Sequence, residues 1–133
     1  MAKGLGADER YWQALDEGRL ELPRCASCRR WTWPAPFRCG ACGAGEADWK
    51  PVEPVGMIYS WTRTWHSFGG AESLAIPYVS VLVELPEAGG IRLLGKFDDE
   101  VQPPVIGLPV KGKIGVTQAF DRAIPAWQWE PRT

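Results

Sequence analysis

The sequence predicts a mainly β protein that consists of an N-terminal helix, a zinc ribbon and a five-stranded OB-like barrel. Three observations lead to this fold class. Helical periodicity occurs near the start of the 133-residue chain, all four cysteines lie close together in the segment that follows, and a period of two begins at Val55. We therefore expect a helical segment over residues 1–22, a ribbon over residues 23–50 and a barrel over residues 51–133.

The helix is predicted from a capping residue and a short apolar face. Asp8 can cap a helix that runs to about Glu17. Tyr11, Trp12 and Leu15 then fall on one face of that helix. Helices below ~12 residues are marginal on their own. We therefore expect this face to pack against its own domain or against another subunit.

The cysteines form two C-x-x-C pairs with ten residues between them, Cys25 with Cys28 and Cys39 with Cys42. Two such pairs supply the four tetrahedral thiolates that a structural Zn²⁺ prefers. Two disulfides are disfavoured, because no signal peptide is recognisable and the cysteine density is below that of secreted scaffolds. A redox pair would need a βαβ context, and a catalytic zinc would keep an open position. The sequence therefore predicts a structural zinc ion.

The segment between the two cysteine pairs is rich in aromatic residues and proline. Pro34 and Pro36 exclude a helix and favour an extended edge. Trp31, Trp33 and Trp49 either cover the zinc site or serve as anchors for a partner, since tryptophan is typical of interface hot spots. Both interpretations remain open from the sequence alone.

From Val55 onward, apolar and polar residues alternate as they do in strands with one buried face. Within the first strand, Met57, Tyr59, Trp61 and Trp65 are expected on one face. The five expected strands are Val55 to Trp65, Pro77 to Leu85, Ile91 to Phe97, Val110 to Val116 (with Val110, Ile114 and Val116 inside), and a last strand that includes Phe120 or Ala126 to Trp129. Short strands joined by Gly-rich turns predict a small closed barrel with an OB-like Greek key.

The overall charge excludes some classes of partner. Fifteen basic and sixteen acidic residues give a net charge of −1, which supplies no global field for nucleic acid or an anionic membrane. No apolar run approaches the ~20 residues of a membrane span. The thiols indicate a reducing compartment, so the cytoplasm is the expected location.

Basic residues are nevertheless concentrated around the first cysteine pair, where five arginines face the single acid Glu21. They are Arg19, Arg24, Arg29, Arg30 and Arg38. Such an excess suits phosphate groups or an acidic partner surface. A solvated face, or arginines that offset the negative charge of a zinc–tetrathiolate, explains it equally well.

No catalytic arrangement is recognisable in the sequence. His66 is the only histidine, and a catalytic histidine needs a nucleophile and an orienting group beside it. The loop from Trp65 to Ile76 is long for a hairpin, which is typical of functional or mobile loops, although Phe68 and Leu74 could simply cap the barrel. We expect that the chain does not catalyse a reaction by itself.

A series of short motifs, kept in order along nearly the whole chain, resembles a known family. The motifs are the helix with Trp12 and Leu15, Gly18-Arg19-Leu20, the two cysteine pairs with Pro34 and Pro36 between them, Val55-Gly56, Pro77-Tyr78-Val79, Val83-Glu84-Leu85, Arg92-Leu93-Leu94-Gly95 and Gly107-x-Pro109-Val110. The chain thus resembles the rubredoxin-like zinc-ribbon plus OB-fold family first catalogued as domain of unknown function 35. It departs from the usual pattern at Arg29, where the family has Gly, and at Gly40, where it has Pro.

The resemblance implies a role in acyl-CoA metabolism. Members of the family are small partners of thiolase-fold enzymes, including acetyltransferases, hydroxymethylglutaryl-CoA-forming assemblies and aldolases of steroid side-chain degradation, and some are the tail of a hydratase subunit. The resemblance therefore implies a non-catalytic accessory subunit that braces a thiolase-fold enzyme and helps to form or channel its acyl-CoA site. Eight tryptophans in 133 residues also favour a protein partner.

Two sets of residues are candidates for these contacts. Arg29, Arg30 and Arg63 are hypothesised to meet the phosphates of a CoA thioester. The residues expected at the partner interface are Tyr11, Trp12, Trp31, Trp33, His66 and Phe68. The closest alternative is a stand-alone acyl-CoA-binding protein.

A less favoured alternative is an OB-fold nucleic-acid-binding module, in which Tyr59, Trp61 and Trp65 would stack on bases. Residues 51–133 hold seven basic residues against nine acidic ones, which argues against that class.

Overall fold

A computed structural model of the chain describes residues 6–119 and 121–132. The chain divides into two compact units. Of the described residues, we call 6–53 and 86–91 the ribbon unit, and 54–85, 92–119 and 121–132 the barrel unit. The predicted boundaries after residues 22 and 50 stay predictions. No helix among the described residues is long and apolar enough to cross a membrane.

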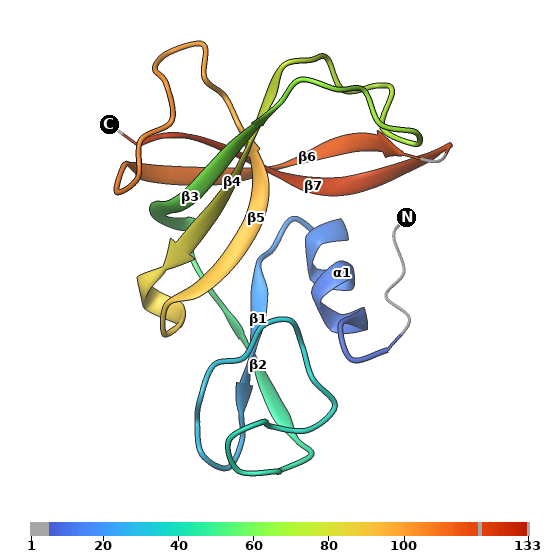
Figure 1. Ribbon diagram of the computed structural model, residues 1–133. Coiled ribbons are helices and arrows are strands. Elements are labelled where there is room, and N and C mark those ends of the chain that lie inside the picture. Colours follow the sequence, from blue (N-terminus) through green and yellow to red (C-terminus); the bar gives the residue numbers. More distant parts are fainter. Residues whose placement is uncertain (1–5, 120, 133) are drawn as a thin grey trace. The chain divides into compact units, whose positions relative to one another are not determined.

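The ribbon unit begins with helix α1, Glu9–Asp16, which contacts strand β1, Glu21–Cys25 (Figure 1). Strand β2, Ala47–Pro51, pairs antiparallel with β1. The predicted helix is confirmed, with Asp8 as its N-cap residue. The Asp8 side chain makes no capping bond, however, because its Oδ2 instead accepts a hydrogen bond from Trp12 Nε1 at 2.9 Å.

The interior of the ribbon unit is small and contains one acid. Tyr11, Ala14 and Leu15 of α1 are buried, as are Leu20 and Leu22 that follow it. Between those two leucines lies Glu21, the one charged side chain that is buried among the described residues.

The Glu21 carboxylate is held by two arginines. Arg10 Nε donates to Oε1 at 2.8 Å and Arg19 Nε donates to Oε2 at 3.2 Å. The two cations satisfy the carboxylate and connect the helix, the following turn and β1.

The barrel unit contains five strands in the closed order β3-β4-β5-β7-β6, in which β3 also pairs with β6. β5 and β7 pair in parallel, whereas β3 pairs antiparallel with β4 and with β6. The five-stranded closed barrel and the predicted OB-like Greek key are confirmed. The strands are β3 Val55–Thr64, β4 Tyr78–Leu85, β5 Ile91–Phe97, β6 Pro109–Ala119 and β7 Arg122–Pro131. The short 3₁₀ helix η1, Pro86–Ala88, and the first residue of β5 belong to the ribbon unit.

The barrel core forms around the inward residues of β4 and the indole of Trp129. Trp129 is fully buried, and two glycines make room for its ring. A Cβ added at Gly95 would lie 2.6 Å from Trp129 Nε1, and one at Gly112 would lie 2.8 Å from the ring. Other core residues are Ile58, Val79, Val81, Val83, Leu85, Leu93, Phe97 and Val110.

The predicted faces of β3 are wrong because of a β-bulge. Ile58 pairs with Val83, but the next pair is Ser60 with Leu82, so the alternation shifts at this point. Met57 therefore lies opposite Glu84 but Trp61 lies opposite the buried Val81, so the two do not share a face. Ile58 is the core residue of β3, and Met57 and Tyr59 are each 44% exposed.

The last two strands, β6 and β7, agree only in part with the expected ones. Val116 was expected inside the barrel but is 66% exposed, because β6 extends beyond the strands that close the barrel. The predicted last strand over Ala126 to Trp129 lies within β7, and the alternative at Phe120 falls outside the described residues.

Candidate functional site

The two cysteine pairs adopt the same backbone turn. The N–H of Arg29 donates to the carbonyl of Cys25 at 3.0 Å, and the N–H of Gly43 donates to the carbonyl of Cys39 at 2.9 Å. The residue after each pair has a positive φ, 66° at Arg29 and 78° at Gly43. Glycine adopts this conformation without steric cost, so the arginine occupies a conformation that is unfavourable for its side chain.

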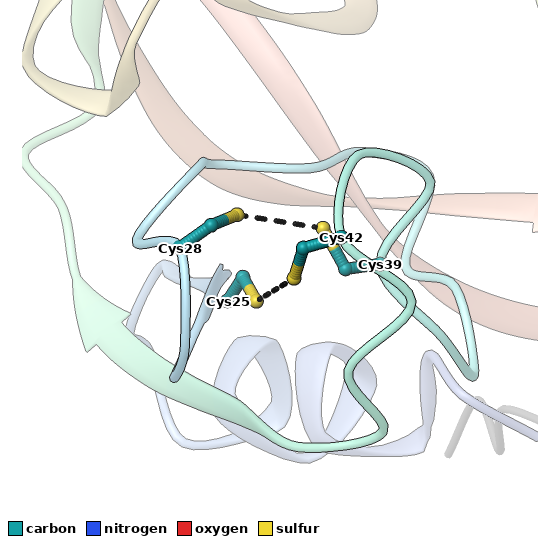
Figure 2. A group of neighbouring side chains, drawn as sticks. All are labelled: Cys25, Cys28, Cys39 and Cys42. Carbon is teal, nitrogen blue, oxygen red and sulfur yellow. Dashed lines mark hydrogen bonds between the residues drawn. The ribbon is translucent and has the colours of Figure 1, made fainter.

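The four cysteine side chains point toward one another from the two turns (Figure 2). The Sγ atoms of Cys25 and Cys42 are 3.6 Å apart, and those of Cys28 and Cys39 are 3.7 Å apart. All four sulfurs lie within 4.8 Å of one another. Zn–S bonds of about 2.3 Å would place tetrahedral sulfurs about 3.8 Å apart, so the sulfur cluster fits a zinc ion.

Backbone amides favour the thiolate form of the first cysteine in each pair. The N–H groups of Cys28 and Ser27 lower the pKa of Cys25 to about 6. The N–H groups of Cys42 and Ala41 lower the pKa of Cys39 in the same way.

The second cysteine of the first pair behaves differently. The N–H of Arg30 acts to lower the pKa of Cys28, but desolvation and the sulfurs of Cys39, Cys25 and Cys42 outweigh it and raise the value to about 11. Four adjacent sulfurs cannot all be negative without a compensating cation. A dication removes this repulsion, so the donor set suits a closed, structural zinc centre formed by Cys25, Cys28, Cys39 and Cys42.

The tryptophans near the cysteines pack on neighbours other than the sulfurs. The Trp31 ring lies 5.6 Å from the guanidinium carbon of Arg24 and approaches Gly89. The Trp33 ring lies 4.3 Å from that of Tyr11. The small cavity beside the cysteines is lined by Thr32, Pro36, Phe37 and residues 44–47, with Cys25 and Cys39.

The six residues expected at a partner interface differ in exposure. Tyr11 is only 5% exposed, and Trp12, Trp31 and Trp33 are half-buried. His66 and Phe68 are exposed, and their rings meet edge to face at 4.8 Å. Their role at an interface stays a prediction.

The three arginines predicted to meet CoA fall into different units. Arg29 and Arg30 are exposed and adjacent in the ribbon unit. Arg63, in the barrel unit, donates to Asp99 at 3.4 Å and lies 5.5 Å from the Trp61 ring. Arg63 is therefore already engaged by an acid, whereas the charges of Arg29 and Arg30 face solvent.

Sequence reasoning did not anticipate a polar cavity of about 300 Å³ in the barrel unit. Tyr78, Lys96 and Gln128 line it together with the acidic turn Asp98 to Glu100. Nothing in the alternation of residues indicated it, because its lining comes from four separate strands, β4, β5, β6 and β7, and from the turn after β5. Its mixed charges do not define one class of ligand.

No second group of metal-binding side chains accompanies the cysteines in the described part of the chain. There, the four cysteines are the one group of three or more His, Cys, Asp or Glu side chains close enough to hold a metal ion.

Comparison with known proteins agrees with the division of the chain into a ribbon unit and a barrel unit. Residues 12–47 match a family model described as the ChsH2 rubredoxin-like zinc ribbon domain. Residues 49–114 match a model described as the ChsH2 C-terminal OB-fold domain. The cysteine cluster is thus a rubredoxin-like zinc ribbon.

One curated relative is a probable enoyl-CoA hydratase alpha subunit from Thermomonospora curvata, 33% identical over 111 residues. The alignment covers 80% of this chain but only 33% of that protein, so the chain spans about a third of the relative's length.

Two solved structures share the fold. A chain of the Ltp2-ChsH2(DUF35) aldolase superposes with a TM-score of 0.77 and 26% identity, covering 98% of both chains. A DUF35-family protein of unknown function from Sulfolobus solfataricus superposes with a TM-score of 0.62 and 19% identity, covering 96% of this chain and 87% of that one. The two solved structures show the shared fold, and the two family models, which together match residues 12–47 and 49–114, establish that the chain belongs to the ChsH2 (DUF35) family of zinc-ribbon plus OB-fold proteins.

Proposed function

We propose that this chain is a non-catalytic accessory subunit of an acyl-CoA-processing complex, in which it braces a thiolase-fold enzyme and helps to form or channel the acyl-CoA site. The observation that carries the proposal is the match to the Ltp2-ChsH2(DUF35) aldolase, which covers 98% of both chains. A chain of nearly the same extent and fold is thus part of an aldolase assembly. The name of the curated hydratase subunit supports the same class of substrate.

The chemistry of the described residues supports a role without catalysis. His66 is exposed and contacts the Phe68 ring rather than a nucleophile or an orienting carboxylate. The four thiols are engaged as a closed set of zinc ligands, which leaves no coordination position for substrate. The reacting groups would therefore belong to the partner, a thiolase, acyltransferase or retro-aldolase acting on CoA thioesters.

Particular residues are assigned to this role. Arg29 and Arg30 are the better candidates for CoA phosphates, because both are exposed and no acid of the described residues forms an ion pair with either. Arg63 would first have to leave Asp99. His66 and Phe68 are the candidates for direct contact with the partner. The half-buried ring of Trp12 offers less exposed surface for such a contact.

Two alternatives are less well supported. A stand-alone acyl-CoA-binding protein would need an apolar pocket for the acyl chain, but the cavity of about 300 Å³ beside Tyr78 is lined largely by polar side chains. A nucleic-acid-binding barrel would need free cations beside its aromatic residues, but Arg63 and Arg92 are paired with Asp99 and Glu84.

The proposed location is the cytoplasm, because a four-thiolate zinc centre suits a reducing compartment.

The test is to tag the chain, isolate it from its native host and identify the bound proteins by mass spectrometry. The proposal expects a thiolase-fold subunit in stoichiometric amount. It is contradicted if the chain is isolated alone and binds CoA thioesters unaided. A Cys39→Ser variant, which removes a buried zinc ligand, should recover much less of the partner than the wild-type chain.

A further inference from the structure

The β6–β7 hairpin extends well beyond the strands that close the barrel (Figure 1). β3 pairs with β6 only from Pro109 to Lys111, and β5 pairs with β7 only at Gln128 and Trp129. Residues 112–119 and 122–127 therefore pair only with the facing strand of the hairpin, and we call them the β6–β7 arm. The matched part of the OB-fold family model ends at residue 114, so most of the arm lies beyond it.

The outer edge of β6 in this arm is defined by two hydrogen bonds. The N–H of Gly112 donates to the carbonyl of Pro54 at 2.7 Å, and the carbonyl of Gln118 accepts from Ser73 Oγ at 2.7 Å. Alternate residues of an antiparallel strand direct their N–H and C=O groups to the same side. The N–H and C=O groups of Ile114 and Val116 therefore face this edge as well. No strand pairing or hydrogen bond from the described residues engages them.

The outer edge of β7 differs, because it contains a proline. Pro125 lies opposite Val116, in a pair whose backbone groups point away from the hairpin. The missing N–H of Pro125 therefore costs the β6–β7 ladder nothing, but it removes a donor from the outer edge of β7. Proline at such positions blocks the addition of another strand. One edge of the arm is thus closed to pairing and the other is open.

The side chains beside the open edge are apolar. Ile114 pairs with Trp127 and Val116 pairs with Pro125, so these four side chains share one face of the arm. The Val116 side chain is 66% exposed on this face. Of the other three side chains, Trp127 is buried and Ile114 and Pro125 are half-buried. A two-stranded hairpin is at best marginally stable in water, so an added strand would both satisfy the edge and cover Val116.

We infer that the β6 edge from Ile114 to Val116 receives an extended segment of the partner enzyme subunit, which adds a strand to the arm. The inference rests on the proposed function. The segment must be extended, since only a strand offers alternating donors and acceptors in step with β6, and it carries apolar residues at alternate positions to cover Val116. We assign the edge to the partner rather than to a second copy because the solved relative of nearly equal extent belongs to an assembly with another protein.

Hydrogen exchange of the wild-type proteins tests the pairing directly. The amide protons of Ile114 and Val116 should exchange rapidly in the isolated subunit and at least about tenfold more slowly in the stoichiometric complex with the thiolase-fold subunit. The Ala123 amide, on the outer edge of β7, is the internal control and should remain unprotected.

A pair of proline variants tests the energetic consequence. Val116→Pro removes a donor from the open edge without breaking a β6–β7 hydrogen bond, and Ala123→Pro makes the same change on the opposite edge. Loss of one hydrogen bond and of the Val116 apolar contact should weaken partner binding about tenfold or more for Val116→Pro, while Ala123→Pro binds as wild type. Zinc content and far-ultraviolet circular dichroism check that both variants fold.

Each outcome decides the inference. Unchanged exchange of Ile114 and Val116 in a stoichiometric complex would overturn it while leaving the accessory-subunit role intact. Equal loss of binding in both proline variants would also overturn it, because the effect would then not be specific to the β6 edge. Protection that arises in the isolated subunit at dimer-forming concentrations would assign the edge to a second copy instead. If no thiolase-fold subunit binds the wild-type chain, the proposed function and this inference both fail.

Discussion

The ribbon unit and the barrel unit are stabilised in different ways. The ribbon unit buries few large apolar side chains, chiefly Tyr11, Leu15, Leu20 and Leu22, and it gathers four thiolates around one point. The barrel unit buries a run of valines and leucines around the indole of Trp129. A metal ion substitutes for a core in the first unit, whereas burial of apolar surface suffices in the second.

The largest difference between the two units is expected when one zinc ligand is removed. Cys39→Ser should lose most of the stabilisation by zinc, which is about 10–16 kcal/mol for small zinc modules, and should unfold the ribbon unit. The barrel unit should keep its strands, because its core contains no metal ligand. Zinc content by atomic emission and circular dichroism measure the two effects.

The control for this prediction is Ser27→Ala, an exposed residue of the first cysteine turn that is not a ligand, which should retain one zinc ion per chain. Loss of the barrel strands in Cys39→Ser would contradict the separation of the two stabilising mechanisms.

Truncation of Trp129 should destabilise the barrel unit and leave the ribbon unit intact. Trp129→Ala should lower the free energy of unfolding of the barrel unit by about 3–5 kcal/mol, because the ring fills the space between Gly95 and Gly112. Zinc binding should be preserved. Denaturant unfolding followed by circular dichroism provides the measurement, and Trp65→Ala, at a residue 69% exposed, is the matched control with little effect.

A smaller effect is expected at the buried acid of the ribbon unit. Glu21→Gln should destabilise this unit by about 1–3 kcal/mol, since Arg10 and Arg19 would lose a shared carboxylate. Both arginines are about half exposed, which keeps the cost below that of a fully buried pair. The temperature of zinc release reports the change, and Glu46→Gln, at an exposed position, should leave that temperature unaltered.

The smallest predicted effect compares the two cysteine turns with each other. Arg29→Gly should stabilise the ribbon unit by up to about 1 kcal/mol, because glycine tolerates the φ of 66° that Gly43 matches in the second turn. Arg30→Gly is the control, because φ is not positive there and the change should destabilise slightly. A stabilised Arg29→Gly subunit whose complex binds acyl-CoA more weakly would support a functional reason for the arginine.

The sequence predicted the features that depend on local spacing. The four zinc ligands follow from two C-x-x-C pairs, and the barrel follows from the alternation that begins at Val55. The shift at Tyr59 could not be predicted, since a β-bulge depends on which residues of β4 lie opposite β3. The positive φ of Arg29 could not be predicted either, because the turn rather than the residue type sets that conformation.

The β6–β7 arm shows why exposure is harder to predict than strand identity. Val110 and Val116 have the same parity in β6, yet the first is fully buried and the second is 66% exposed. Alternation identifies which residues share a face, but the lengths of β3 and β5 decide how far that face is covered.

The most direct test of the accessory role is a turnover assay on CoA thioesters with the purified thiolase-fold subunit and this chain. The account predicts that this chain alone is inactive, that the thiolase-fold subunit alone is weakly active or inactive, and that the two together restore activity at a one-to-one ratio of subunits. Turnover by this chain alone, or full activity of the thiolase-fold subunit without it, would contradict the account.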